Sequence, residues 1–128
     1  MNGEKFFKEM YRDIWQSKDL SKFDQYYSED FVETISVSDE NKNPIELQMN
    51  YFDLEKQAKW QKENYKDITI EIKKIVSTGN DYISVHFYST SIDKLTNELK
   101  HRYVNGIWRL NKENKIDRVW AVVTPYYP

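Results

Sequence analysis

The sequence contains no cysteine and only three glycines and three prolines among its 128 residues. The absence of cysteine excludes disulfide bonds, thiol nucleophiles, iron–sulfur clusters and cysteine-ligated zinc sites. So few glycines argue against a glycine-rich nucleotide-binding loop or a repeat array. No apolar run approaches the roughly 18 residues that span a bilayer, and the first residues lack the apolar stretch of a signal peptide. We therefore expect a cytoplasmic protein with no membrane partner.

Neither sign of charge dominates, because 19 lysines and arginines stand against 21 aspartates and glutamates, for a formal charge of −2. Such a balance predicts no attraction of the whole domain to nucleic acid or to an anionic membrane. The chain has only two histidines, His86 and His101. Two histidines without a nearby carboxylate make a poor metal site, so we expect neither a metal nor another cofactor.

Aromatic residues are the abundant class, since four Trp, ten Tyr and six Phe make up 16% of the chain. Disordered chains are poor in aromatics, so this composition excludes disorder. Each buried aromatic side chain removes about 150–250 Å² from water and can anchor a hydrophobic core. An aromatic-lined ligand pocket would produce the same excess, and both interpretations stay open at this point.

Apolar residues recur at helical spacing in three segments, 4–17, 20–27 and 51–65. The spacing of three and four residues places them on one face, which predicts three amphipathic helices. Asn50 precedes the third segment and is a suitable N-cap, and Asp19 can cap the second.

Alternating apolar and polar residues predict five strands, at 31–37, 68–76, 82–92, 99–110 and 116–124. The polar segment 38–44 predicts a loop, and Asn105-Gly106 predicts a bulge or kink in its strand. Short connections between the last four strands predict an antiparallel meander, and helices gathered at the start predict an α+β fold. We expect a single domain over residues 1–128, with the helices on one face of a strongly bent antiparallel sheet.

Two segments of the sequence resemble the nuclear transport factor 2-like superfamily and, within it, the SnoaL-like polyketide cyclase branch. Residues 26–33 (YYSEDFVE) resemble the segment that begins the first strand of that family. Residues 115–123 (KIDRVWAVV) resemble its final strand, where Trp120 is the most telling position. The resemblance implies a cone-shaped sheet around an interior pocket and, in many members, a dimer formed through the outer sheet face. It implies no particular reaction, because the pocket serves isomerisation, cyclisation, dehydration, epoxide hydrolysis or binding alone.

The proton-transfer residues that the resemblance implies are absent from this sequence. The family's last-strand His falls on Val119, its Asp two residues later on Ala121, and its first-strand His on Thr34. Residues i and i+2 of a strand face the same side, and neither valine nor alanine can transfer a proton. We therefore expect binding of a small apolar or aromatic molecule, without catalysis or with weak catalysis.

The expected ligand-binding residues combine these family positions with aromatic and polar side chains near the cone mouth. They are Trp15, Tyr26, His101, Tyr103, Trp108, Val119 and Ala121. If the strand 99–110 holds one bulge, His101 and Tyr103 share the inner face with Trp108, and Arg102 lies outside. Core packing is the alternative for the aromatic residues, and a surface or interface position is the alternative for the histidines.

One alternative function is an enzyme, an isomerase, cyclase or dehydratase that uses His101 and Tyr103. Tyr103 would polarise a ligand carbonyl, and Glu33 would replace the missing base.

The other alternative is an interaction module that acts as a homodimer without a ligand. Tyr82, His86 and Tyr88 alternate with apolar positions of the strand 82–92 and are expected on the outer sheet face, at a dimer interface.

Overall fold

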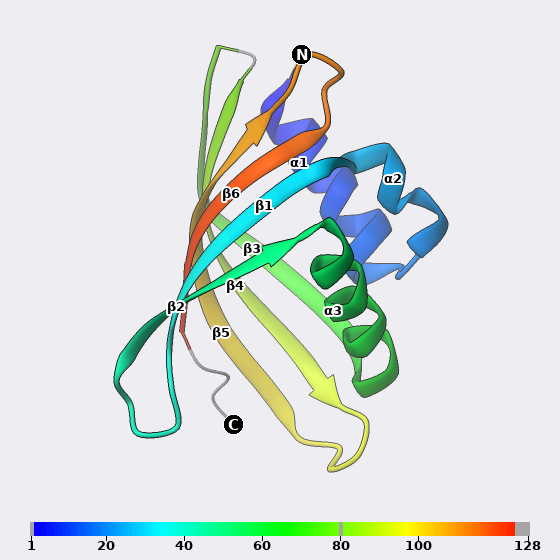
Figure 1. Ribbon diagram of the computed structural model, residues 1–128. Helices are drawn as coiled ribbons and strands as arrows, with labels where there is room; N and C mark the ends of the chain where they lie inside the picture. Colours follow the sequence, from blue (N-terminus) through cyan, green and yellow to red (C-terminus); the bar gives the residue numbers. More distant parts are fainter. Residues whose placement is uncertain (1, 80, 125–128) are drawn as a thin grey trace.

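A computed structural model describes residues 2–79 and 81–124. The elements follow in the order α1 (Gly3–Met10), η1 (Tyr11–Gln16), η2 (Leu20–Lys22), α2 (Phe23–Tyr26), β1 (Tyr27–Ser38), β2 (Pro44–Asn50), α3 (Tyr51–Asn64), β3 (Tyr65–Thr78), β4 (Tyr82–Asp93), β5 (Leu99–Leu110) and β6 (Ile116–Val123). Figure 1 shows the helices on one side of a strongly curled sheet. The predicted α+β class is confirmed.

The six strands form one mixed sheet in the order β2-β1-β6-β5-β4-β3. Strands β3 to β6 form the predicted antiparallel meander. The prediction of a wholly antiparallel sheet is wrong, because β1 pairs in parallel with β6, as Figure 1 shows. Short turns determine only how consecutive strands pair, and they carry no information about the partner of a strand that lies far away in sequence.

Strand β2 lies in a segment where the sequence pattern predicts none. Most of its side chains are exposed, so the alternation of buried and exposed positions is missing. It pairs antiparallel with β1, which brings Leu47 opposite Ile35 and Met49 opposite Glu33. Because β2 is the edge strand, pairing on one side alone stabilises it, and a hydrophobic pattern is not required.

The helical segments are more divided than their sequence pattern predicts. Helix α1 ends at Met10 and continues as the π-helix η1, and the second segment is a 3-10 turn followed by the short helix α2. Helix α3 begins as predicted. Asn50 accepts a hydrogen bond from the Asp53 backbone at 2.9 Å, and the Asp53 carboxylate accepts one from the Asn50 backbone at 3.0 Å. This reciprocal pair is a capping box, which satisfies backbone groups that a helix start leaves without partners.

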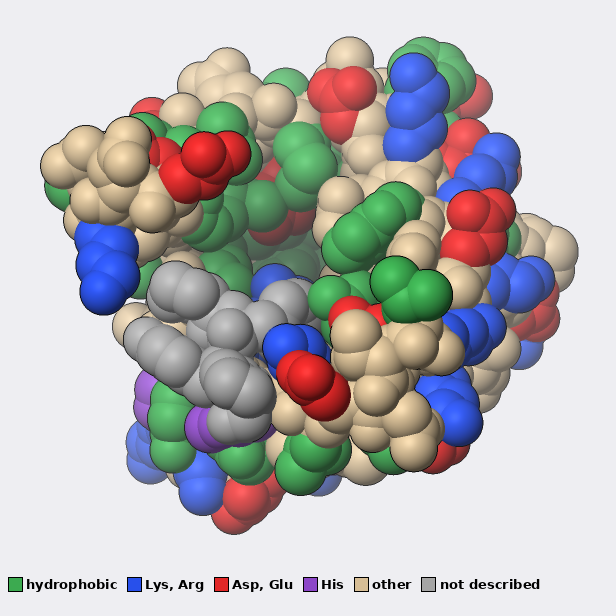
Figure 2. Space-filling model, turned by 90° about the horizontal axis from the view of Figure 1, so that it is seen from below, with side chains coloured by type: hydrophobic (Ala, Val, Ile, Leu, Met, Phe, Trp, Pro, Cys, Tyr) green, Lys and Arg blue, Asp and Glu red, His purple; other side chains and the backbone are tan. Residues whose placement is uncertain are grey.

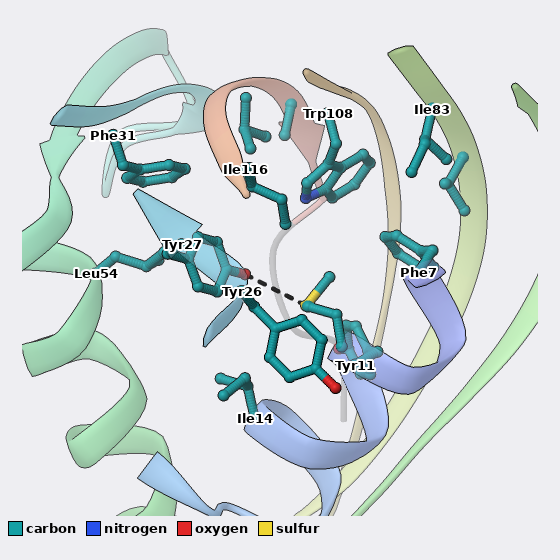
Figure 3. Packing of buried hydrophobic residues seen from close by; sticks show 14 of the residues in the cluster. Phe7, Tyr11, Ile14, Tyr26, Tyr27, Phe31, Leu54, Ile83, Trp108 and Ile116 are labelled. Atoms are coloured by element: carbon teal, nitrogen blue, oxygen red, sulfur yellow. Dashed lines mark hydrogen bonds between the residues drawn. The ribbon is translucent and has the colours of Figure 1, made fainter. Parts of the chain in front are cut away.

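Aromatic side chains make up much of the core between the helices and the inner face of the sheet (Figure 3). The ring of Phe7 meets Trp108 edge-on with centroids 5.0 Å apart, and it lies 5.9 Å from Phe87. The ring of Phe23 stacks on Tyr27 at 4.7 Å. A large part of the aromatic excess is therefore core packing.

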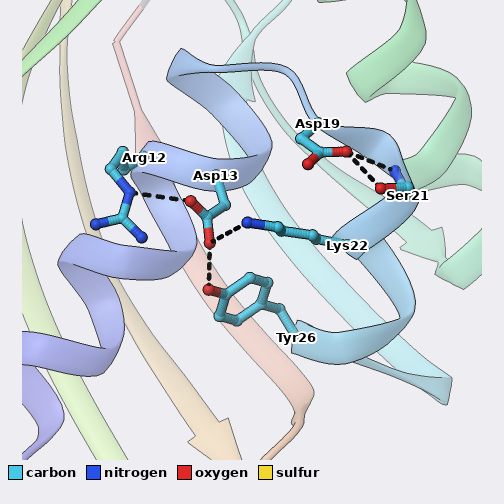
Figure 4. Close-up of polar contacts among 6 residues, drawn as sticks. All are labelled: Arg12, Asp13, Asp19, Ser21, Lys22 and Tyr26. Carbon is cyan, nitrogen blue, oxygen red and sulfur yellow. Dashed lines mark hydrogen bonds and ion pairs between the residues drawn. The ribbon is translucent and has the colours of Figure 1, made fainter.

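A buried carboxylate links the first two helical segments (Figure 4). Asp13 accepts hydrogen bonds from the Tyr26 hydroxyl at 2.6 Å and from Arg12 Nε at 2.9 Å, and Lys22 Nζ lies 3.7 Å away. The bond from Arg12 and then that from Tyr26 lower the pKa of Asp13. Burial, together with the bond to Asp13, raises the pKa of Tyr26 to about 12. Tyr26 therefore stays protonated and acts as a structural donor.

Candidate functional site

A cavity of about 270 Å³ remains between the inner sheet face, η1 and α3. Its lining is mainly apolar and consists of Met10, Tyr11, Trp15, Tyr27, Glu33, Ile35, Val37, Leu47, Met49, Leu54, Gln57, Gln61, Phe87, Arg102, Val104, Trp108, Ala121 and Val123. Figure 2 shows this face of the molecule hollowed, with hydrophobic side chains around the hollow. Ligand pockets commonly measure about 300–1,000 Å³, so this cavity suits a compact molecule.

Strand alternation decides which side chains of β1 reach the cavity. Glu33, Ile35 and Val37 are two residues apart, and all three line it. Thr34 lies on the opposite face, where its hydroxyl accepts a hydrogen bond from Arg118 Nη2 at 2.9 Å. In this chain the inward position of the first strand is therefore held by Glu33 and not by Thr34.

Glu33 is the only acidic side chain that lines the cavity among the described residues. Its neighbours in the sheet register are apolar, Met49 on β2 and Val119 on β6. Burial raises the pKa of Glu33 to about 7, and the positive charge of Arg102 offsets only part of that shift. The Glu33 carboxyl can therefore gain and lose a proton near neutral pH.

Strand β5 has no bulge at Asn105-Gly106, because its pairing with β4 and β6 runs unbroken through both residues. A Cβ on Gly106 would lie 2.9 Å from the Trp120 carbonyl oxygen and 3.0 Å from the Trp108 ring. Glycine is thus needed here for close packing beneath Trp108, and not for a bulge. Without the bulge, Arg102 faces the cavity, which contradicts the prediction that it lies outside.

The same register turns His101 and Tyr103 to the outer face of the sheet, so the prediction that they face inward is wrong. Both belong to an aromatic cluster with residues of β4. Tyr103 stacks on His86 with centroids 5.7 Å apart and lies 5.0 Å from Tyr88, and His101 lies 5.7 Å from Tyr88. The histidine side chains seen in Figure 2 lie outside the hollow.

The remaining expected ligand residues divide between the cavity wall and the packed core. Trp15, Trp108 and Ala121 line the cavity, whereas Val119 is fully buried opposite Trp108 on the neighbouring strand. Tyr26 is directed toward Asp13 and does not line the cavity (Figure 4). The short helix α2 ends at Tyr26, whose ring is buried in the core against Phe6 while its hydroxyl reaches Asp13.

Tyr27 takes the inward position instead. Its hydroxyl accepts a hydrogen bond from Trp15 Nε1 at 3.4 Å and donates one to Met10 Sδ at 3.4 Å (Figure 3). Burial raises the pKa of Tyr27, so its hydroxyl stays neutral.

The residues expected at a dimer interface lie on the outer face of β4. Tyr82, His86 and Tyr88 are exposed or partly exposed there, while the alternate positions, among them Val85 and Phe87, are buried in the core. Their role in a dimer remains a prediction.

No protein-family model matches the sequence, and no curated protein does. Several solved structures share its architecture. IdmH, a candidate polyketide cyclase from Streptomyces antibioticus, is 14% identical, with a TM-score of 0.73 over 96% of this chain and 92% of IdmH. A ketosteroid isomerase-like protein from Erwinia carotovora atroseptica is 16% identical, with a TM-score of 0.59 over 96% and 98% of the two chains. The chain has the nuclear transport factor 2-like fold.

A third structure with this cone fold is an LEH-like epoxide hydrolase from M. tuberculosis. It is 11% identical, with a TM-score of 0.63 over 91% of this chain and 78% of the hydrolase. The names of these three proteins refer to different reactions. The nuclear transport factor 2-like fold therefore indicates where a site lies, and the function must be inferred from the side chains in it.

Among the described residues, 2–79 and 81–124, no three or more His, Asp or Glu side chains lie close enough together to hold a metal ion. In the same part of the chain, no helix has both the length and the apolar character to cross a bilayer.

Of the two charged residues that line the cavity in the described part of the chain, the sequence patterns leave the orientation of Glu33 open and place Arg102 outside. Counting back from Trp108 without a bulge puts Val104 and Arg102 on the inner face. An arginine on the strand face that also carries Val104 and Trp108 is the signal that could have identified this side of the site. Gln57 and Gln61 lie four residues apart on α3, and that spacing places both on one helix face.

Proposed function

We propose that the chain binds a small apolar molecule in the cavity and that Glu33 transfers a proton to or from it. The observation that carries this proposal is a single carboxyl set among apolar side chains, with a pKa of about 7. General acid–base catalysis is most efficient when the pKa of the catalytic group lies near the working pH. The names of the similar structures, which include a cyclase and an epoxide hydrolase, support a small-molecule partner.

The chemistry that fits one carboxyl is proton transfer beside a carbonyl group. The Glu33 carboxylate accepts a proton from the carbon next to the carbonyl, which leaves an enolate. The protonated Glu33 then returns the proton to the same carbon or to another one. Both steps balance without an oxidant, a reductant or a cofactor, and the apolar wall that includes Trp15 and Trp108 surrounds the reacting atoms.

Exchange of deuterium into an apolar ketone tests this proposal, with β-tetralone as the probe and proton NMR as the readout. We expect the protein to accelerate exchange beside the carbonyl, with a rate that rises with pH and levels off above the pKa of Glu33. The Glu33→Gln variant should lose about 100-fold or more of the acceleration. Glu46→Gln is the matched control, because Glu46 is exposed and borders the outer sheet face.

The outcomes separate binding from proton transfer. Tryptophan fluorescence reports binding, because Trp15 and Trp108 line the cavity. Binding of the ketone without accelerated exchange would support the binding function and contradict the catalytic role of Glu33. Exchange at the wild-type rate in Glu33→Gln would contradict that role as well.

We also propose that the outer sheet face binds a second copy of the chain. Exposed apolar side chains gather there, among them Ile107 at 42% and Val122 at 59% exposure. Trp120 lies beside them, with the guanidinium of Arg118 4.9 Å from its ring. An interface between two identical copies must be self-complementary, and an apolar centre with charged groups at its edge meets that condition.

Light scattering after gel filtration tests the dimer at micromolar concentration. We expect the wild-type chain to have twice the monomer mass and Val122→Lys to be monomeric, because the substitution buries a charge at the interface centre. Leu95→Lys is the control, since Leu95 is 92% exposed in the turn between β4 and β5. A monomeric wild-type protein would contradict the proposed dimer.

A further inference from the structure

We infer that the molecule bound in the cavity carries one carboxylate on an otherwise apolar body, and that this carboxylate pairs with Arg102. The inference rests on the proposed binding function and adds the class of ligand to it. Arg102 is the only lysine or arginine among the described residues that line the cavity. The fork of N–H groups on an arginine side chain matches the two oxygens of a carboxylate.

The number of charges favours a monoanion. Arg102 supplies one positive charge. Among the described residues that line the cavity, Gln57 and Gln61 add neutral amides to Glu33 and the two tyrosines. A phosphate group carries up to two negative charges and is usually held by several cations or backbone N–H groups. A carboxylate needs one guanidinium, which is what this cavity supplies.

The positions of Arg102 and Glu33 give the ligand a direction. Glu33, Val119 and Trp108 are consecutive partners in the sheet register and lie where the cone is closed by its core. Arg102 lies farther along β5, toward the turn that joins it to β4. Leu47, at 49% exposure, marks the open side of the cavity. The carboxylate would therefore stay near the mouth, and the apolar body would extend inward toward Glu33.

The charge balance of the cavity supports an anionic ligand. When Glu33 is protonated, it no longer offsets the charge of the guanidinium, which stays positive at any physiological pH. Among the described residues, the other cavity-lining side chains with an ionisable group are Tyr11 and Tyr27, and burial raises the pKa of Tyr27 so that its hydroxyl stays neutral. Among the described residues that line the cavity, the guanidinium of Arg102 is then the one charged group within a mainly apolar wall, where a charge interacts more strongly than in water.

Calorimetric titration with two probes of the same shape tests the inference. Cinnamate and cinnamamide share an apolar aromatic body, and only the first carries a charge. We expect the wild-type protein to bind cinnamate about 10-fold or more tightly than the amide. Arg102→Met should abolish this preference, so that the two probes bind with similar affinity.

A matched control and a second variant accompany the titration. Arg109→Met is the control, since Arg109 lies on the same strand, faces outward and pairs with Asp117 at 2.9 Å. It should keep the full preference for cinnamate. Arg102→Gln repeats the test with a polar side chain, in case the methionine variant does not fold, and thermal unfolding checks each variant.

Each outcome decides between the two proposals. Equal affinities of the wild-type protein for the two probes would overturn the carboxylate inference and leave the proposed binding function in place. A preference for cinnamate that survives in both Arg102 variants would overturn the role of Arg102. Failure of both probes to bind would overturn the proposed binding function, and the inference with it.

Discussion

Glu33→Gln is expected to remove a pH dependence of the free energy of unfolding worth about 3 kcal/mol. The pKa of Glu33 is about 7 in the folded protein, against an ordinary value of 4.5. Between these two values the folded protein holds a proton that the unfolded chain releases. The stability of the wild-type protein therefore falls as the pH rises through this window, and it is constant above it. Glutamine has no such proton, so the variant becomes progressively more stable than the wild type as the pH rises.

Urea unfolding of the wild type and of Glu33→Gln, measured at pH values across the range between the two pKa values, tests this effect. The stability advantage of Glu33→Gln over the wild type should be larger at about pH 8 than at about pH 5. Glu46→Gln should follow the wild type at both values, because Glu46 is exposed. Stability curves for Glu33→Gln and the wild type that run parallel across the window would show that Glu33 has an ordinary pKa.

Phe7→Ala is expected to destabilise the fold by about 3–5 kcal/mol. Phe7 is 1% exposed, and its ring lies against Trp108 and Phe87, so it attaches α1 to the inner face of two strands. Removing the ring loses its burial and leaves a void that neighbouring side chains fill only in part.

Thermal or urea unfolding measures this loss. Phe52→Ala is the matched control, because Phe52 is 64% exposed on α3 and should change stability by no more than about 0.5 kcal/mol. A similar effect of the two substitutions would contradict the placement of α1 against the sheet.

The sequence predicts best those parts of the fold that depend on local interactions. The start of α3 follows from Asn50 and Asp53, which cap each other within one helical turn. The two faces of β4 follow from strict alternation, with Val85 inside and His86 outside. The parallel pairing of β1 with β6 is different, because the partners are separated by most of the chain and no local pattern identifies them.

The site was harder to predict, because one assumption about register decides the orientation of a whole strand segment. A bulge at Asn105-Gly106 would have turned Tyr103 inward and Arg102 outward, and its absence reverses both. Glycine is needed at position 106 for another reason, because the Trp108 ring packs against it. The orientation of Glu33 likewise depends on β2 and β6, whose pairing with β1 is not visible in the residues around it.

The aromatic residues serve three purposes in the folded chain. Some are core residues, such as Phe7 and Phe23, and others, such as Trp15 and Trp108, also line the cavity. A third group, which includes Tyr103, lies on the outer sheet face. The cavity wall and the core are thus continuous, which is why composition alone could not separate them.

The most direct test of the proposed site is the titration of the Glu33 carboxyl itself. NMR spectra of protein labelled with carbon-13 at the glutamate carboxyl groups follow each side chain, and Glu33→Gln identifies the signal. A midpoint near pH 7 is the expected result. A midpoint near the ordinary value of 4.5 would contradict it, because burial among apolar side chains would then not raise the pKa of Glu33 toward neutral pH.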